Sequence, residues 1–106
     1  MPSRNLRLTA FEHADSDEDA EIANQGAAAQ EMTGWRLWSV TGDQTYFFPP
    51  GYVLGAGGWV RVHSGPDAVD SPPSDLRWTR RYIWNNEGDE ARLLDARGSE
   101  VDRWGY

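Results

Sequence analysis

The 106-residue chain contains no cysteine, which excludes disulfide bonds, thiolate metal sites and cysteine nucleophiles together. It also contains no lysine, and all ten of its basic residues are arginine. We interpret the missing lysine as the effect of a GC-rich coding sequence and not as a sign of function. No apolar run approaches the roughly 20 residues that a membrane-spanning helix needs, and no signal-peptide core is present. We therefore expect no membrane partner.

Acidic residues outnumber basic ones by 17 to 10, which gives a formal net charge of −7. Proteins bind the phosphates of nucleic acids through cationic side chains and counterion release, so this balance argues against a nucleic-acid partner. Aromatic residues nevertheless make up 12% of the chain, with six tryptophans, which is too much for a disordered segment. At this length we expect a single domain over residues 1–106, ordered from about residue 5 and able to form part of a longer protein.

Apolar and polar residues alternate in short runs, a pattern typical of half-buried β-strands. The first run, at residues 5–12, places Ala10 on the face of two leucines and Phe11 on the opposite face. Further strands are predicted at residues 20–24, 35–40, 44–48, 52–54, 59–62, 91–94 and 100–104. Residues 27–32 are predicted to form a crossing loop or one short turn, and residues 64–74 the longest loop.

Turn-forming Gly, Pro, Asn and Asp residues separate these runs at intervals of about eight to twelve residues, as in a β-sandwich or barrel. The sequence therefore predicts an all-β domain with short strands. The apolar residues of the alternating runs form its predicted core: Leu8, Ile22, Trp35, Leu37, Phe48, Leu54, Val60, Val62, Leu93 and Val101.

Several motifs follow one another in a specific order along most of the chain. They are Glu21-Ile22 with Asn24 and Gly26, Thr33-Gly34-Trp35-Arg36-Leu37, Phe48-Pro49, Leu54-Gly55, Gly57-Gly58-Trp59, Trp84-Asn85-Asn86-Glu87-Gly88-Asp89, and then Leu93, Asp95, Gly98, Val101 and Asp102. In this order and spacing, from about residue 6 to residue 106, the chain resembles the lamin tail domain. That family is the immunoglobulin-like sandwich at the end of nuclear lamins, and it also occurs in many bacterial proteins. We interpret the chain as a bacterial-type member.

The resemblance implies an immunoglobulin-like β-sandwich that acts as a non-catalytic adaptor or targeting module. It also implies a protein partner or a neighbouring domain, often within a larger exported protein beside a catalytic domain. The location would then be extracellular or at the cell surface. The chain departs from the family at Ala20, Ala23 and Ala91, where bulkier side chains are commoner, and in the aromatic stretch 78–84. These departures affect the identity of the partner surface and not the fold.

The stretch around residues 77–84 combines arginine with aromatic residues, the types enriched at interface hot spots. Arginine interleaved with aromatic rings also stacks on bases or sugars, so a carbohydrate- or nucleic-acid-binding module is the alternative function. A structural interpretation competes with both: Trp78 and Trp84 would pack in the core or cover a sheet edge, and the arginines would pair with acids. The candidate binding residues are Trp38, Arg77, Trp78, Arg80, Arg81 and Tyr82.

No catalytic constellation is present in the sequence. His13 and His63 have no metal-type spacing, and we expect each to be a surface or loop residue. No G-x-S-x-G nucleophile elbow occurs. Paired carboxylates would need a cleft for which a domain of this size offers little room. We therefore predict that the chain is not an enzyme.

The main expectation is that the chain binds no cofactor. Calcium is the one alternative that the residues suggest. Asp15, Asp17 and Asp19 alternate as in a calcium loop, but the run lacks the mid-loop Gly and the twelfth-position Glu of an EF-hand. A second acidic group falls in the C-terminal turns. Solvated loops and ordinary turn chemistry explain both groups more simply. The residues of the second group are Glu87, Asp89, Asp95 and Asp102.

Overall fold

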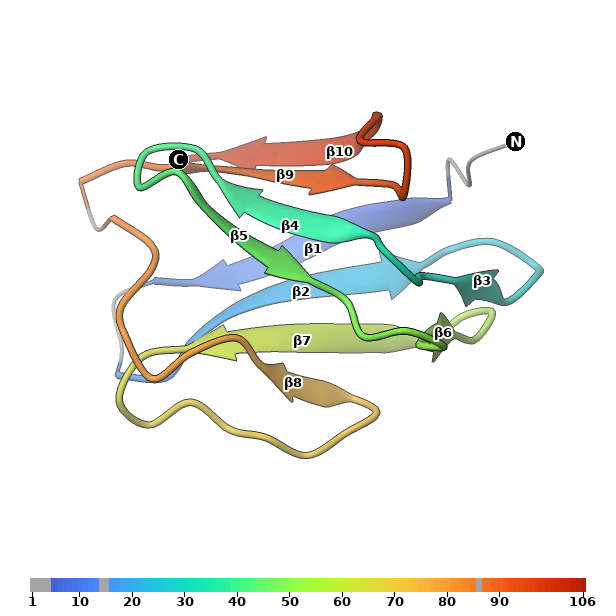
Figure 1. The fold of residues 1–106 in the computed structure, drawn as a ribbon, viewed down its shortest axis with the longest axis horizontal. Helices are drawn as coiled ribbons and strands as arrows, with labels where there is room; N and C mark the ends of the chain where they lie inside the picture. Colours follow the sequence, from blue (N-terminus) through green and yellow to red (C-terminus); the bar gives the residue numbers. More distant parts are fainter. Residues whose placement is uncertain (1–4, 14–15, 86) are drawn as a thin grey trace.

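Two four-stranded sheets face each other in the computed structural model, which describes residues 5–13, 16–85 and 87–106 (Figure 1). One sheet has the strand order β1-β2-β7-β8 and the other β10-β9-β4-β5, while β3 and β6 form a separate pair at one end. The strands are β1 (Leu6–Glu12), β2 (Glu18–Asn24), β3 (Gln30–Glu31), β4 (Arg36–Ser39), β5 (Gln44–Phe47), β6 (Val53–Leu54), β7 (Trp59–Ser64), β8 (Asp75–Arg77), β9 (Glu90–Leu94) and β10 (Glu100–Gly105).

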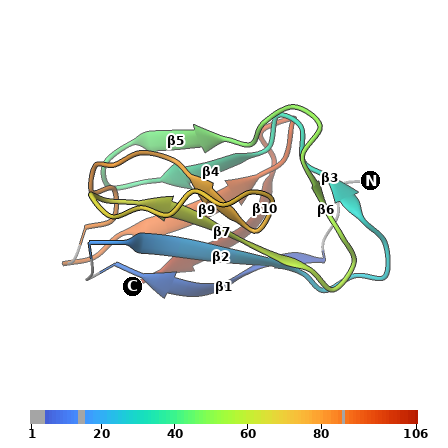
Figure 2. The same cartoon turned by 90° about the horizontal axis from the view of Figure 1, so that it is seen from below.

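The predicted all-β, immunoglobulin-like sandwich is confirmed. Figure 2 shows its two layers nearly edge-on, with β5, β4 and β9 in one layer and β7, β2 and β1 in the other. The described residues contain no helix, and hence none that could cross a membrane. The alternation of small or apolar residues with polar ones explains these layers. On β2, for example, every second side chain from Glu18 to Asn24 is buried between them.

The apolar side chains that fill the space between the layers include all ten predicted core residues, nine of them buried. Val101 is the exception and is only partly buried. The register of β10 against β9 shifts between Glu100 and Asp102, so Val101 lies at an irregularity of the ladder and leaves the strict alternation. It still packs against the cluster of buried side chains.

A similar irregularity changes which face of the sheet the residues at the end of β1 point to. The register against β2 shifts between Leu8 and Ala10. A bulge of one residue exchanges the two faces of the strand beyond it. As a result Phe11, which was predicted on the face opposite the leucines, packs against the core. Its ring lies edge-on to Trp84, with the centroids 4.8 Å apart.

Two strands extend two residues beyond their predicted boundaries, and two further strands were not predicted. Strand β2 begins at residue 18 and β7 continues to residue 64, because these two ends pair with each other. Residues 30–31, predicted as loop or turn, form β3 by pairing with β6. Strand β8 was not predicted and pairs in parallel with β7. Each of these segments gains strand geometry from a partner distant in the sequence.

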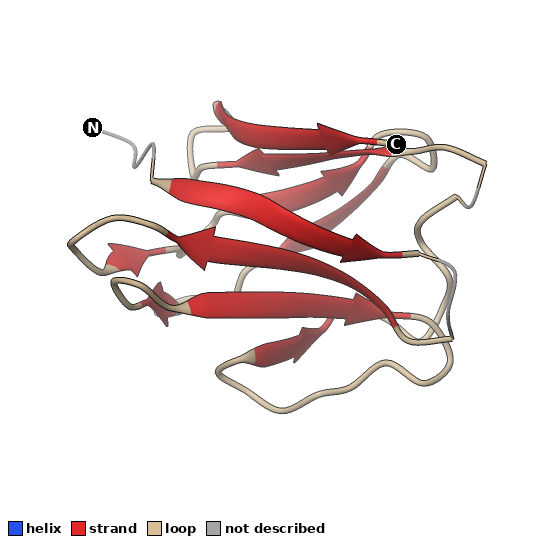
Figure 3. Cartoon of the chain, turned by 180° about the vertical axis from the view of Figure 1, so that it is seen from behind, coloured by secondary structure: helices blue, strands red, loops and turns tan. Residues whose placement is uncertain are grey.

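The layers are joined where β1 of one sheet lies beside β10 of the other (Figure 3). The backbone N–H of Leu8 donates to the Asp102 carboxylate at 2.9 Å. This hydrogen bond satisfies an outward-facing donor on the edge of β1 and ties the two sheets together.

Candidate functional site

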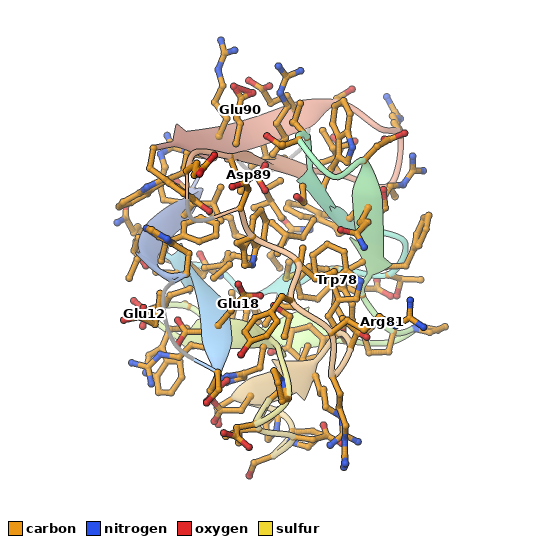
Figure 4. All side chains as sticks on the ribbon, turned by 90° about the vertical axis from the view of Figure 1, so that its left-hand side faces the viewer. Glu12, Glu18, Trp78, Arg81, Asp89 and Glu90 are labelled. Carbon is orange, nitrogen blue, oxygen red and sulfur yellow. The ribbon has the colours of Figure 1, made fainter. Side chains whose placement is uncertain are left out.

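Residues 78–84 cross one end of the sandwich, from β8 in the first sheet towards β9 in the second (Figure 4). Two of their aromatic side chains turn inward. Trp84 is buried, and Trp78 is half-buried with its ring 6.0 Å from that of Trp84 and 5.9 Å from that of Tyr46. The two tryptophans therefore belong to the core, as the structural interpretation expected, and do not form an exposed stacking platform.

The residues between these tryptophans form an exposed tip. Arg80, Arg81 and Tyr82 all lie on the surface, and 61% of Tyr82 is accessible to solvent. Within the described part of the chain, no carboxylate lies within ion-pair distance of either arginine. We call residues 80–82 the Arg-Arg-Tyr tip.

Backbone hydrogen bonds hold the tip on its N-terminal side and at its centre. On its N-terminal side, the N–H of Trp78 donates to the His63 carbonyl at 2.8 Å, and at its centre the Arg81 carbonyl accepts from the N–H of Gly65 at 2.7 Å. Gly65 has a φ of 100°, and a Cβ there would collide with the Ser16 carbonyl. Only glycine permits this approach. These bonds hold the tip against His63 at the end of β7 and against the adjoining Gly65.

A buried carboxylate holds the C-terminal side. Glu18, only 1% exposed, accepts hydrogen bonds on Oε1 from the Ser64 hydroxyl at 2.9 Å, from the Ile83 N–H at 2.8 Å and from the Trp84 N–H at 3.4 Å. Three donors converging on one oxygen compensate the cost of burying it without a cationic partner. Glu18 therefore fixes where the tip rejoins the core.

A second buried polar cluster lies beside this support. His63, 4% exposed, contacts Asp17 Oδ1 through Nδ1 and Asp75 Oδ1 through Nε2, each at 2.7 Å. The prediction of a surface or loop histidine is wrong, because β7 extends through His63 and two distant segments cover the ring. With both ring nitrogens engaged, neither is available as a metal ligand or a catalytic base.

The protonation of this cluster follows from its geometry. Burial by itself lowers the pKa of His63, but hydrogen bonds to Asp75 and Asp17 and the charges of Asp17 and Asp19 outweigh it and raise the pKa above 6.5. Burial would raise the pKa of Asp75, but its hydrogen bonds to His63 and Ser74 lower that pKa below 3.8. The favoured state is an imidazolium between two carboxylates.

Removing this imidazolium should make stability less dependent on pH. A folded-state pKa above the unfolded value gives stabilisation that is complete below about pH 6.5 and is lost as pH rises through the folded pKa. We expect His63→Gln to lower the unfolding free energy by about 2 kcal/mol at pH 6, and by less at pH 9. Urea unfolding at the two pH values measures this, with His13→Gln as the matched control that keeps the wild-type decline. An equal loss at both pH values would contradict the charged state of His63.

The remaining candidates lie apart from the tip. Trp38 is on the outer face of β4, where its Nε1 donates to Asp43 at 3.0 Å and the Arg92 guanidinium lies 5.3 Å from its ring centroid. Arg77 in β8 is 3.8 Å from Asp70. Since Trp78 faces the core and Trp38 faces outward, the structure does not bring the six candidates together. It leaves residues 80–82 as the exposed group.

Comparison with known proteins identifies the family to which this sandwich belongs. The family model described as Lamin Tail Domain matches residues 2–106. The chain belongs to the lamin tail domain family. It is also 33% identical to human Lamin-B2 over 88 residues, which cover 81% of this chain and 13% of Lamin-B2. The lamin tail domain is a structural, non-catalytic immunoglobulin-like family, and in lamins it is a protein-interaction module.

The acidic groups considered for calcium are distributed over this lamin tail domain. Asp89 and Asp95 lie at opposite ends of β9, a separation of roughly 17–20 Å for a strand of this length. Each carboxylate accepts nearby backbone N–H groups, for example from Thr41 to Asp89 and from Arg97 to Asp95. No group of three or more histidine and acidic residues in the described ranges is arranged to hold a metal ion. Asp15, one residue of the first acidic group, lies outside those ranges.

Sequence reasoning missed the residues that support the tip in this lamin tail domain. Glu18 lies in the acidic run of Asp15, Asp17 and Asp19, for which a solvated loop is the simpler expectation, although it continues the alternation of Ala20, Ile22 and Asn24 by one step. That continuation is the signal that could have identified a buried strand residue. Gly65 carries no comparable signal, because its role depends on a contact with the distant Ser16.

Proposed function

We propose that this lamin tail domain is a non-catalytic binding module that recognises a protein partner through the Arg-Arg-Tyr tip. The observation that carries the proposal is an exposed Arg80-Arg81-Tyr82 group whose backbone is fixed by buried polar residues. Arginine and tyrosine are enriched at interface hot spots, and a pre-organised loop loses little entropy on binding. The role that we propose is adaptor or targeting within a larger bacterial protein.

The alternative, a carbohydrate or nucleic-acid ligand, draws less support from the geometry. Stacking on sugars or bases needs exposed rings, and only Tyr82 of the segment presents one while Trp78 and Trp84 pack inward. The net charge of −7 further opposes nucleic acid. We therefore place protein recognition first.

The test replaces Arg80, Arg81 and Tyr82 by alanine together. These side chains are exposed, so we expect the unfolding free energy to change by no more than about 0.5 kcal/mol per site. In affinity capture from the source cells, the triple variant should lose a protein that wild type retains, and calorimetry with that purified protein should show at least about tenfold weaker binding.

Arg97→Ala, in an exposed turn, is the matched control and should retain the partner. A glycan array and a nucleic-acid shift assay at low salt complete the design. Binding in either assay that the triple variant loses, with no protein captured, would overturn protein recognition in favour of the alternative.

A further inference from the structure

The second surface that the fold offers is a sheet edge. Of the four outer edges of the two sheets, β1 and β10 lie beside each other and are linked by the bond from Leu8 to Asp102. The edge of β8 is covered at Asp75, whose N–H and C=O both bond to the backbone of Ser71. Among the outer strands of the two four-stranded sheets this leaves β5, which pairs only with β4.

The register identifies which backbone groups of β5 face outward. Phe48 N–H donates to the Trp35 carbonyl at 2.9 Å, so in the antiparallel ladder with β4 the next pair, Phe47 with Arg36, is not hydrogen-bonded. The same alternation leaves Thr45 without a backbone partner on β4. On the other side of β4, the Val40 N–H donates to the Glu90 carbonyl of β9. This bond is consistent with the alternation along β4, in which Trp35, Leu37 and Ser39 bond to β5. The N–H and C=O groups of Thr45 and Phe47 therefore point away from the sheet.

Strand β5 lacks most of the features that protect natural edge strands. Its four residues include no charge and no proline, and its register against β4 is regular, so only its short length protects it. Phe47 is 60% exposed on the outer face. Such an edge can accept an extended peptide as an additional strand.

An arginine beside the edge selects the chemistry of that peptide. The Arg36 guanidinium lies 5.4 Å from the Phe47 ring centroid, and its Nη2 donates to the Ala96 carbonyl in a long bond of 3.4 Å. Its Nε is buried and finds no hydrogen-bond partner among the described residues. No carboxylate of the described residues forms an ion pair with it. A strand added to β5 would lie about 10 Å from β4, a span that an arginine and a glutamate side chain bridge together.

We infer that the β5 edge binds an extended peptide with acidic side chains at alternate positions, which face Arg36 and Phe47. A second copy of this chain fits less well, because the uncharged β5 brings no carboxylate to Arg36. The inference rests on the proposed function in treating the chain as a protein-binding module, but it uses a different surface from the Arg-Arg-Tyr tip.

The test uses two synthetic peptides, one alternating valine and glutamate and one alternating valine and lysine. The glutamate peptide should slow hydrogen exchange at the Thr45 and Phe47 amides, and the lysine peptide should not. Thr45→Pro removes one outward N–H while keeping the bonds to β4, and it should weaken binding by about tenfold or more. Arg36→Gln should weaken binding about fivefold.

Phe47→Glu is the third variant. It places a negative charge at an exposed site, so it should abolish binding of the glutamate peptide without affecting the core. The triple alanine variant of the tip should bind the peptide like wild type, which separates failure of this inference from failure of the proposed function. Unprotected amides with both peptides, or equal binding of the two, would overturn the inference. So would a wild-type dimer in sedimentation that Thr45→Pro dissociates, because the occupant would then be a second copy.

Discussion

Replacing Trp35 by alanine is expected to lower the free energy of unfolding by about 3–5 kcal/mol. Trp35 is 4% exposed and belongs to the cluster of side chains between the two sheets. Truncating a ring of this size loses its transfer free energy and leaves a cavity that the surrounding strands only partly fill. A small domain has about 5–15 kcal/mol of stability, so the variant should unfold at a much lower urea concentration, followed by circular dichroism.

Trp59→Ala is the matched control for this experiment. Trp59 is 43% exposed, and its ring contacts the Arg61 guanidinium, 4.6 Å from the ring centroid. Its removal should cost about 1 kcal/mol, since it loses a surface cation–π contact and opens no cavity. If the two variants unfold at the same urea concentration, Trp35 is not at the centre of the core.

Period-two alternation predicted the fold best where one face of a strand is buried along its whole length. Strand β4 is the clearest case, with Leu37 buried and Trp38 facing outward, as the sequence indicated. The same reasoning failed at Phe11, where a register shift changes which face of the sheet the following residues point to. A register shift also accompanies the partial exposure of Val101. A shift of this kind depends on the neighbouring strand, so nothing in the local sequence announces it.

Two of the shortest strands, β3 and β8, were beyond prediction for a related reason. Strand β8 has three residues, of which only Leu76 is apolar and buried, and such a run shows no period. It is a strand because β7 offers a free edge in parallel register. Two-residue β3 depends in the same way on β6. Tertiary pairing, and not intrinsic preference, decides segments of this length.

Composition identified the segment of the candidate site but not its geometry. Arginine and tryptophan at residues 77–84 indicated a binding surface, yet which rings turn inward depends on contacts with Phe11 and Tyr46 from two other strands. His63 shows the same limit. Its neighbours Asp17 and Asp75 are 46 and 12 residues away, so its burial could not be inferred from the residues beside it in sequence.

Replacing Glu18 by alanine is expected to lower the free energy of unfolding by about 3–4 kcal/mol. The substitution leaves the Ser64 hydroxyl and the N–H groups of Ile83 and Trp84 without their acceptor, and each unsatisfied buried group costs about 1–3 kcal/mol, reduced where water enters the cavity. The Arg-Arg-Tyr tip should also lose its C-terminal anchor. Urea unfolding measures the first effect, and hydrogen exchange at the Ile83 amide measures the second.

Glu18→Gln separates the hydrogen bonds from the negative charge. Glutamine keeps an oxygen that can accept from Ile83 but no longer gives charge-assisted bonds, so its expected cost is about 1–2 kcal/mol. The exposed Glu87→Ala variant controls for the loss of one acidic residue and should change stability by less than about 0.5 kcal/mol. If Glu18→Ala matched that control and left exchange at Ile83 unchanged, the buried carboxylate would not be what holds the tip against the core.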